Sequence, residues 1–277
     1  MTVRFHITFV ACLASFLGGA PRLSAQFDLY IAHVADGAGW FSEVAVGNPG
    51  TSTVTCTFTT FDGQGNPLAL GYILANPGAA PTARTRSRAK AATSLPVDSV
   101  SLSIPAGGTA SLKTSGAGDG TANPLQGGAE LNCSALVIGG VTYWYTIGGD
   151  LVTGIGVPAT DTTTVFRAVG GNENTAFSVY NPSTNLLNLN VEAYDDTGAN
   201  LYGPVSLLID PNGHYAFNAN AVLTTLPSGF YGSFRFTSSG QQFVPLALGV
   251  AITSTNAAGY VLYTIPSSTS VIAGIDQ

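Results

Sequence analysis

The chain has few charged residues: only 9% of its 277 residues are Asp, Glu, Lys or Arg, and the net charge is −6. An acidic chain repels the phosphates of nucleic acids, so nucleic-acid binding is not expected. After the N-terminal segment there is no uninterrupted apolar run of about 20 residues, so no membrane-spanning helix is expected in the mature chain. Low charge beside abundant Gly, Thr, Ser and Asn favours an exported β protein over a cytosolic helical one.

Motifs of common hydrolases and metal sites are missing as well. The sequence contains no His-Glu-x-x-His helix, no Gly-x-Ser-x-Gly elbow and no Gly-rich phosphate loop before a Lys. Beyond the N-terminal segment only His33 and His214 remain, and a lone histidine beside a strand is usually a surface or structural residue. We predict no catalytic residues, no metal and no cofactor. A secreted hydrolase is the less favoured alternative, and it requires one of these histidines beside both a Ser and a carboxylate.

Residues 1–25 are predicted to be a secretory signal peptide. Arg4 gives a positive start, Phe5–Leu17 is a short and mostly apolar stretch, and Ala25 is a small residue suited to cleavage. Cleavage leaves 252 residues with seven basic and fifteen acidic side chains, a net charge of −8. The predicted location is therefore extracellular, secreted or at the cell surface, with the periplasm as the alternative.

Two of the three cysteines, Cys56 and Cys133, lie in the predicted mature chain. Each stands in a strand-like run whose period-2 alternation places it on the apolar face, as Cys56 with Val54 and Phe58. In an oxidising compartment they can form a disulfide that joins two sheets, worth roughly 4 kcal/mol in the chain-entropy model. Two buried free thiols are the alternative. The third, Cys12, follows Val10-Ala11 as the cysteine of a lipidation signal would. The apolar run continues past it, however, and this favours an ordinary cleaved signal peptide.

Repeated turn residues indicate an internal duplication. Asn48-Pro49, Phe61-Asp62 and Gly65 recur at an offset of 133 positions as Asn181-Pro182, Tyr194-Asp195 and Gly198. Further along, residues 101–108 match residues 206–213 at an offset of 105, so the first copy carries 28 additional residues. A fixed offset across several turns indicates that one supersecondary unit is used twice.

Strand-like runs separated by Gly, Pro and Asn turns predict the fold class. Both copies contain short runs rich in β-branched and aromatic residues, and no segment has a convincing helical period. We predict an all-β protein of two tandem antiparallel, immunoglobulin-like β-sandwich domains, at residues 26–160 and 161–277. The boundary is expected in the polar stretch 158–164. Within the first domain, Gly139-Gly140 is predicted to be a tight turn between two strands.

The additional residues of the first copy, about 72–97, are predicted to form a long mobile loop. Their Ala-, Pro-, Ser- and Thr-rich composition can bury little apolar surface. They hold four of the seven basic residues of the mature chain, namely Arg84, Arg86, Arg88 and Lys90. This basic segment is a candidate contact for anionic polysaccharide or phospholipid headgroups. A solvated loop open to proteases is the simpler interpretation.

The densest aromatic group is Tyr143-Trp144-Tyr145. On a strand, Tyr143 and Tyr145 share one face while Trp144 points to the other. Flat aromatic rings can stack on the C–H face of a pyranose, so these three residues are candidate ligand-binding residues for a sugar. The simpler interpretation places one face in the core and the other at the interface between domains.

Several stretches of the chain resemble one class of proteins. Ala32–Trp40, Val44–Pro49 and the Phe-Asp-x-x-Gly turn that begins at Phe61 are similar to uncharacterised exported bacterial proteins, of acidobacterial type, with paired β domains. The resemblance spans most of the mature chain and implies an extracellular pair of β-sandwiches, without a known activity or known site residues. The basic insertion departs from that pattern.

We therefore predict a secreted, non-catalytic structural or adhesive protein of the cell surface or extracellular matrix. Its partner is expected to be a surface or matrix polysaccharide or a protein. The main alternative is a carbohydrate-binding module that uses exposed aromatics near Tyr143–Tyr145.

Overall fold

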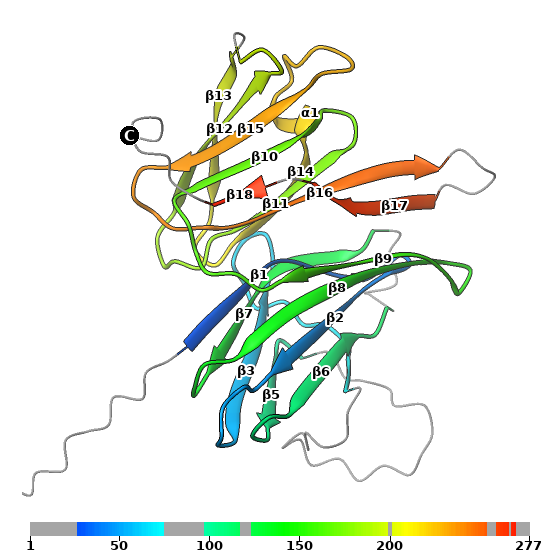
Figure 1. Ribbon diagram of the computed structural model, residues 1–277, viewed down its shortest axis with the longest axis vertical. Coiled ribbons are helices and arrows are strands. Elements are labelled where there is room, and N and C mark those ends of the chain that lie inside the picture. The colour runs from blue at the N-terminus through cyan, green and yellow to red at the C-terminus, as the bar shows by residue number, and fades with distance from the viewer. Residues whose placement is uncertain are drawn as a thin grey trace, which may run out of the picture.

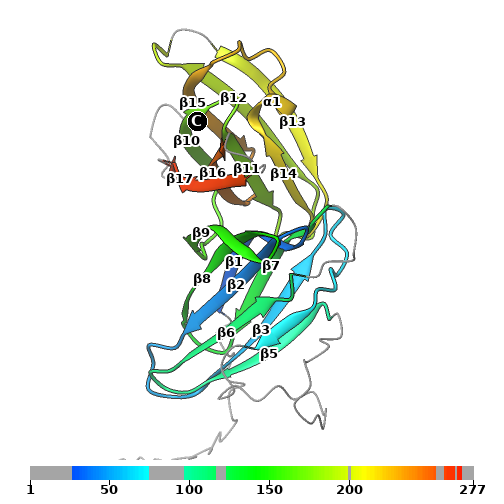
Figure 2. The same cartoon turned by 90° about the vertical axis from the view of Figure 1, so that its right-hand side faces the viewer.

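The computed structural model describes residues 27–74, 97–116, 123–198, 201–253, 259–265 and 267–269. The predicted signal peptide lies outside the described residues, as do the four basic residues of the insertion, Arg84, Arg86, Arg88 and Lys90. The fold is all-β, and every paired strand is antiparallel to its neighbours, as predicted. Figures 1 and 2 show two stacked bodies, which we call the first half and the second half.

The strands of the first half are β1 (Phe27–Gly37), β2 (Trp40–Gly47), β3 (Val54–Phe61), β4 (Tyr72–Leu74), β5 (Ser99–Ile104), β6 (Thr109–Thr114), β7 (Leu125–Cys133), β8 (Ile138–Ile147) and β9 (Asp150–Pro158). The elements of the second half are β10 (Val165–Gly171), β11 (Thr175–Tyr180), β12 (Leu187–Asp195), β13 (Leu201–Ile209), β14 (His214–Asn218), α1 (Ala219–Val222), β15 (Tyr231–Ser238), β16 (Val244–Thr253), β17 (Gly259–Thr264) and β18 (Ser267–Ser268).

Each half consists of two layers of strands that face each other across an apolar core (Figures 1 and 2). In the first half the layers are β5-β3-β7-β1 and β4-β6-β2-β8-β9, joined by the short pairing of β1 with β2 at their turn. In the second half they are β13-β12-β15-β10-β18 and β14-β11-β16-β17. The strands form two layers around a core because successive side chains alternate between core and solvent along each strand. On β3, for example, Val54, Cys56 and Phe58 are buried between more exposed neighbours.

The two halves have the same strand order. When β4 and β18 are set aside, β5-β3-β7-β1 corresponds in chain order to β13-β12-β15-β10, and β6-β2-β8-β9 corresponds to β14-β11-β16-β17. β4 begins the segment that the sequence marks as additional in the first half. Between the halves, β9 ends at Pro158 and β10 begins at Val165.

A buried asparagine fixes the same turn in each half. The Asn48 amide donates to the carbonyls of Ser52, Ile104 and Pro105, at 2.8–3.0 Å. The Asn181 amide makes three contacts at the corresponding positions, to the carbonyls of Asn185, Ile209 and Asp210. Because a buried carbonyl without a donor is costly, each asparagine holds two chain turns together at one end of its sandwich.

The disulfide between Cys56 and Cys133 is present, as predicted, but it does not join two sheets. The two residues lie directly opposite each other on the neighbouring strands β3 and β7, with their Cα atoms 4.1 Å apart. Both were correctly placed on the apolar face, where they are at most 1% exposed. The prediction of an inter-sheet bond was wrong because alternation gives the face of a residue but not its partner strand.

The predicted turn at Gly139-Gly140 is also wrong. Both glycines lie inside β8, where Gly140 pairs with Ala45 of β2, and the connection from β7 runs instead through residues 134–137. A glycine pair also occurs within strands where a neighbouring backbone approaches closely, so the pair alone did not locate the turn.

The second half docks on the first half through the outward face of its β14-β11-β16-β17 sheet. Tyr180, Val244, Leu246 and Leu248 belong to the apolar core of the first half although they stand in β11 and β16. The Tyr180 ring is fully buried and packs against Gly128, where a Cβ atom would come within 2.2 Å of that ring. β11 and β16 are therefore buried on both faces, and this docking holds the two sandwiches in one arrangement.

Candidate functional site

The candidate functional site lies on the outward face of the β4-β6-β2-β8-β9 sheet, around Trp144. On β8, Val141 and Tyr143 are buried, and Trp144 points to the opposite face and is partly exposed. Its indole lies over Gly154, its cross-strand partner on β9, where a Cβ atom would come within 2.4 Å of the ring. Because no side chain at residue 154 separates the ring from the backbone, the indole can lie against the sheet.

Charged and aromatic side chains border this indole. Phe41 of β2 is the cross-strand neighbour of Trp144, with ring centroids 6.2 Å apart and ring planes inclined by 24°. The ammonium of Lys113 sits 3.6 Å from the Phe41 centroid, a cation–π contact. The indole N–H of Trp144 donates to Oε2 of Glu43 at 3.3 Å. The sheet face thus presents the Trp144 and Phe41 rings together with the Glu43 carboxylate and the Lys113 ammonium, which belong to cross-strand partners on β2 and β6.

The other two predicted aromatic residues lie on the opposite face of β8. Tyr143 is 2% exposed and its hydroxyl donates to the His33 carbonyl at 2.7 Å; burial raises the pKa of this phenol above its usual range. Tyr145 packs against Trp40, with ring centroids 4.6 Å apart. The three aromatics therefore do not form one exposed surface, and only Trp144 belongs to the outward face.

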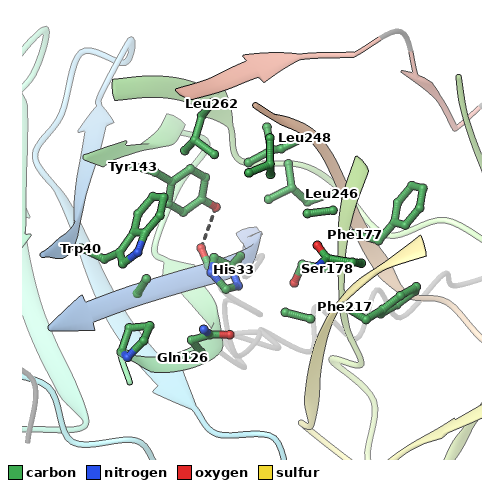
Figure 3. A pocket seen from close by; sticks show the side chains of 16 residues that line it. His33, Trp40, Gln126, Tyr143, Phe177, Ser178, Phe217, Leu246, Leu248 and Leu262 are labelled. Carbon is green, nitrogen blue, oxygen red and sulfur yellow. Dashed lines mark hydrogen bonds between the residues drawn. The ribbon is translucent and has the colours of Figure 1, made fainter. Parts of the chain in front are cut away.

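His33 and His214, expected to be isolated, meet between the two halves (Figure 3 shows the His33 and Ser178 side). His33 Nδ1 lies 3.0 Å from His214 Nε2, and the same Nε2 lies 2.8 Å from the Ser178 hydroxyl. That hydroxyl donates to the Ala32 carbonyl at 2.7 Å. His214 Nε2 carries either one proton or one lone pair, and this single group faces both Ser178 and His33, so the donor and acceptor roles depend on the tautomers of the two rings.

This arrangement does not fit a serine nucleophile. In a catalytic triad a carboxylate orients the histidine that accepts the serine proton, whereas the His214 ring contacts Ser178 and His33, and the serine proton is directed to the Ala32 carbonyl. Burial lowers the pKa of His33 to about 4. Burial first, and then the neighbouring His33, lower the pKa of His214 as well. Both rings are therefore neutral at pH 7, and the group acts as a polar contact that docks the second half on the first.

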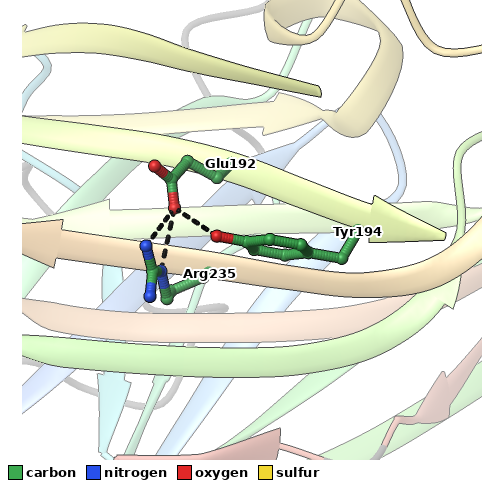
Figure 4. A network of polar contacts seen from close by, with 3 residues as sticks. All are labelled: Glu192, Tyr194 and Arg235. Atoms are coloured by element: carbon green, nitrogen blue, oxygen red, sulfur yellow. Dashed lines mark hydrogen bonds and ion pairs between the residues drawn. The ribbon is translucent and has the colours of Figure 1, made fainter. Parts of the chain in front are cut away.

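A second polar cluster, on the outward side of β12 and β15, is already satisfied by its own members (Figure 4). Arg235 forms an ion pair with Glu192 at 2.6 Å, and the Tyr194 hydroxyl donates to the same carboxylate at 3.1 Å. The guanidinium also lies 5.6 Å from the centre of the Tyr194 ring. These three side chains are thus linked to one another through the Glu192 carboxylate.

Within the described ranges, no group of three or more His, Cys, Asp or Glu side chains could hold a metal ion. The same part of the chain has no helix of the length and apolar character needed to cross a membrane. No family model, curated protein or solved structure matches this chain. The resemblance to exported acidobacterial-type proteins therefore stays a prediction.

Sequence reasoning missed Phe41, Glu43 and Lys113 as part of the site. Their alternation along β2 and β6 places them on an outward face, but only the register brings them beside Trp144. Register between strands far apart in sequence is set by the whole sheet, so no local signal pairs residue 41 with residue 144. The signal that was present is the alternation on β8, which correctly separated Trp144 from its two neighbours.

Proposed function

We propose that this chain is an exported, non-catalytic adhesive protein that binds polysaccharide at the cell surface or in the surrounding matrix. It would do so through the outward face around Trp144, with the second half serving as a rigid body docked behind that site. The Cys56–Cys133 disulfide supports an oxidising compartment, and hence export, because such bonds persist mainly outside the cytosol.

We further propose that both halves derive by duplication from one immunoglobulin-like sandwich. The common strand order supports this origin, as do the equivalent contacts of Asn48 and Asn181. The extracellular sandwiches that the resemblance implies are consistent with the same proposal. In this proposal the two copies of one fold have different roles. The second half docks through its β14-β11-β16-β17 sheet, and the first half presents the outward face of its β4-β6-β2-β8-β9 sheet to the polysaccharide.

The observation that carries the proposal is the Trp144 indole held flat on the sheet over Gly154. A flat, partly exposed ring can stack on the C–H face of a pyranose, and a ring that is already fixed loses little conformational entropy on binding. Glu43 and Lys113 can accept from and donate to sugar hydroxyls beside the ring. Since the two charges offset each other, a neutral polysaccharide is the expected partner.

Binding to insoluble polysaccharides tests the proposal. We would measure co-sedimentation of the mature protein with cellulose, chitin and β-1,3-glucan, for the wild type, Trp144→Ala and the control Tyr231→Ala. Tyr231 is a matched control because it is an aromatic residue, 62% exposed, on the second half. Loss of one stacked ring should weaken binding about tenfold, the equivalent of about 1.4 kcal/mol.

The expected pattern is saturable binding of the wild type to at least one of these polymers, reduced by Trp144→Ala and unchanged by Tyr231→Ala. If the wild type binds none of the three polymers, the proposal is wrong. Equal losses in the two variants would show that binding is non-specific and does not use the Trp144 face.

A further inference from the structure

A pocket of about 430 Å³ lies where the second half docks on the first (Figure 3). One wall comes from β1, β2, β7 and β8 of the first half, and the other from β11, β14, β16 and β17 of the second half. The volume is within the range of sites that hold drug-sized molecules. Pockets between domains are also a preferred place for small ligands.

The pocket walls are mainly apolar and aromatic. The large side chains that line it are Trp40, Tyr143, Phe177, Phe217, Leu246, Leu248 and Leu262. Figure 3 shows Trp40 and Tyr143 on one side of the pocket and the leucines beside them. Two tightly packed sheets would fill such a space, so a volume of this size between the halves offers apolar surface that a ligand can contact.

The polar groups of the lining fall into two kinds. His33 and Ser178 are already bonded, to His214 and to the Ala32 carbonyl. Gln126 and Asn218 are exposed and carry amides that can both donate and accept. A ligand can therefore bury an apolar body in the pocket and make its hydrogen bonds at the exposed amides.

The lining also determines the charge of the ligand. None of the residues that line the pocket is an Asp, Glu, Lys or Arg, and the one histidine among them, His33, is neutral at pH 7. An ionised ligand would lose its hydration without gaining a partner of opposite charge, at a cost of several kcal/mol. A neutral ligand does not bear this cost.

We propose that the pocket between the two halves binds a neutral small molecule with a flat aromatic or alicyclic body and a hydrogen-bonding group at one end. Trp40 and Tyr143 contact the body of the ligand, and Gln126 and Asn218 contact its polar end. This site faces away from the polysaccharide site proposed above, because Tyr143 and Trp144 point to opposite faces of β8. It does not depend on that proposed function.

The neutral fluorescent probe N-phenyl-1-naphthylamine tests the site directly, because its emission rises in an apolar environment. The mature protein would be titrated with this probe and, separately, with its anionic counterpart 1-anilinonaphthalene-8-sulfonate. Two variants fill the pocket from neighbouring strands, Ala216→Leu and Ala176→Leu. Ala106→Leu makes the same substitution in an exposed turn and is the control.

The expected result is saturable 1:1 binding of the neutral probe, at least tenfold weaker in both pocket-filling variants and unchanged in the control. The anionic probe should bind at least tenfold more weakly than the neutral one. The melting temperature of the wild type should rise with the concentration of the neutral probe, a measurement that does not depend on any variant folding.

Three outcomes overturn the proposal: no saturable binding of the neutral probe to the wild type, equal affinity in the wild type and the filled variants, or equal affinity for the anionic probe. Melting curves of the two filled variants identify a variant that is unfolded. In that case the conclusion is drawn from the other variant and from the wild-type melting shift.

Discussion

Replacing the disulfide by the residues that the second half uses instead should weaken the protein without changing its fold. At the position equivalent to the Cys56–Cys133 pair, β12 and β15 place Leu189 opposite Ser238. The double substitution Cys56→Leu and Cys133→Ser therefore introduces a pair that this type of sheet already accommodates. The variant should keep its β content because the second sandwich folds with that pair.

The loss of stability follows from the loop that the bond closes. Cys56 and Cys133 are 77 residues apart, and in the chain-entropy model a loop of this length is worth about 4.5 kcal/mol of unfolding free energy. Burial of the added Leu can recover about 1–2 kcal/mol, since the site is fully buried. We expect a net loss of about 2.5–3.5 kcal/mol, measured by urea denaturation of both proteins under non-reducing conditions.

Two results would refute this reasoning. Unchanged stability would mean that the bond does not restrict the unfolded chain, as the entropic account requires. Loss of β structure by circular dichroism would mean that the two halves are not interchangeable at this position. Wild type measured with a reducing agent is the control, because it removes the bond without changing any side-chain volume.

Two further predictions concern the buried polar groups. Because their folded pKa values lie below the ordinary 6.5, His33 and His214 stabilise the protein above about pH 6.5, and this contribution falls as the pH drops toward 4. Through His33 alone, which keeps some solvent contact at the pocket, the unfolding free energy should fall by about 1–2 kcal/mol from pH 7 to pH 5. Urea denaturation at the two pH values measures this drop, and the double variant His33→Asn, His214→Gln should lack it. Asn181→Ala should lower the unfolding free energy by about 2–4 kcal/mol in the same assay, because three carbonyls lose their donor. The control Asn190→Ala, at an exposed position, should change it by less than about 1 kcal/mol. Equal losses in these two variants would contradict the anchoring role of Asn181.

The class of fold could be predicted from the sequence because alternation and turn residues are local signals. Runs such as Val54–Phe61 carry the period-2 pattern, and Asn48-Pro49 marks the turn that follows β2. The same local signal put Cys56 and Cys133 on the apolar face. Pairing is not local, so it could not show that these residues face each other within one sheet.

An interface between the domains was considered only for the aromatic group at residues 143–145, and the docking surface on β11 and β16 was not predicted, although a signal for it was present. In β16, Val244 to Leu248 is a continuous apolar run and not an alternating one, and all five residues are buried. A strand of this kind is covered on both faces, as in sheets that lie between two layers. The run therefore indicated a covered outer face, but not that the cover is the first half.

The histidine contact and the Trp144 face could be predicted even less well from the sequence, because both depend on the tertiary arrangement. His33 and His214 are 181 residues apart, and only the docking of β14 against β1 brings them together. Trp144 was identified in advance because it belongs to a dense aromatic group, whereas its neighbours Glu43 and Lys113 are ordinary charged residues in the sequence. The residue type identified Trp144 as a candidate binding residue, but the sequence did not show that its ring lies flat over Gly154 on the adjacent strand.

The bond between β3 and β7 has a consequence for how this protein tolerates cutting. Every peptide bond between Cys56 and Cys133, including all those of the basic insertion, lies inside one covalently closed ring. A single cleavage there opens the ring but releases neither fragment, so a nicked molecule stays one piece until the sulfurs are reduced.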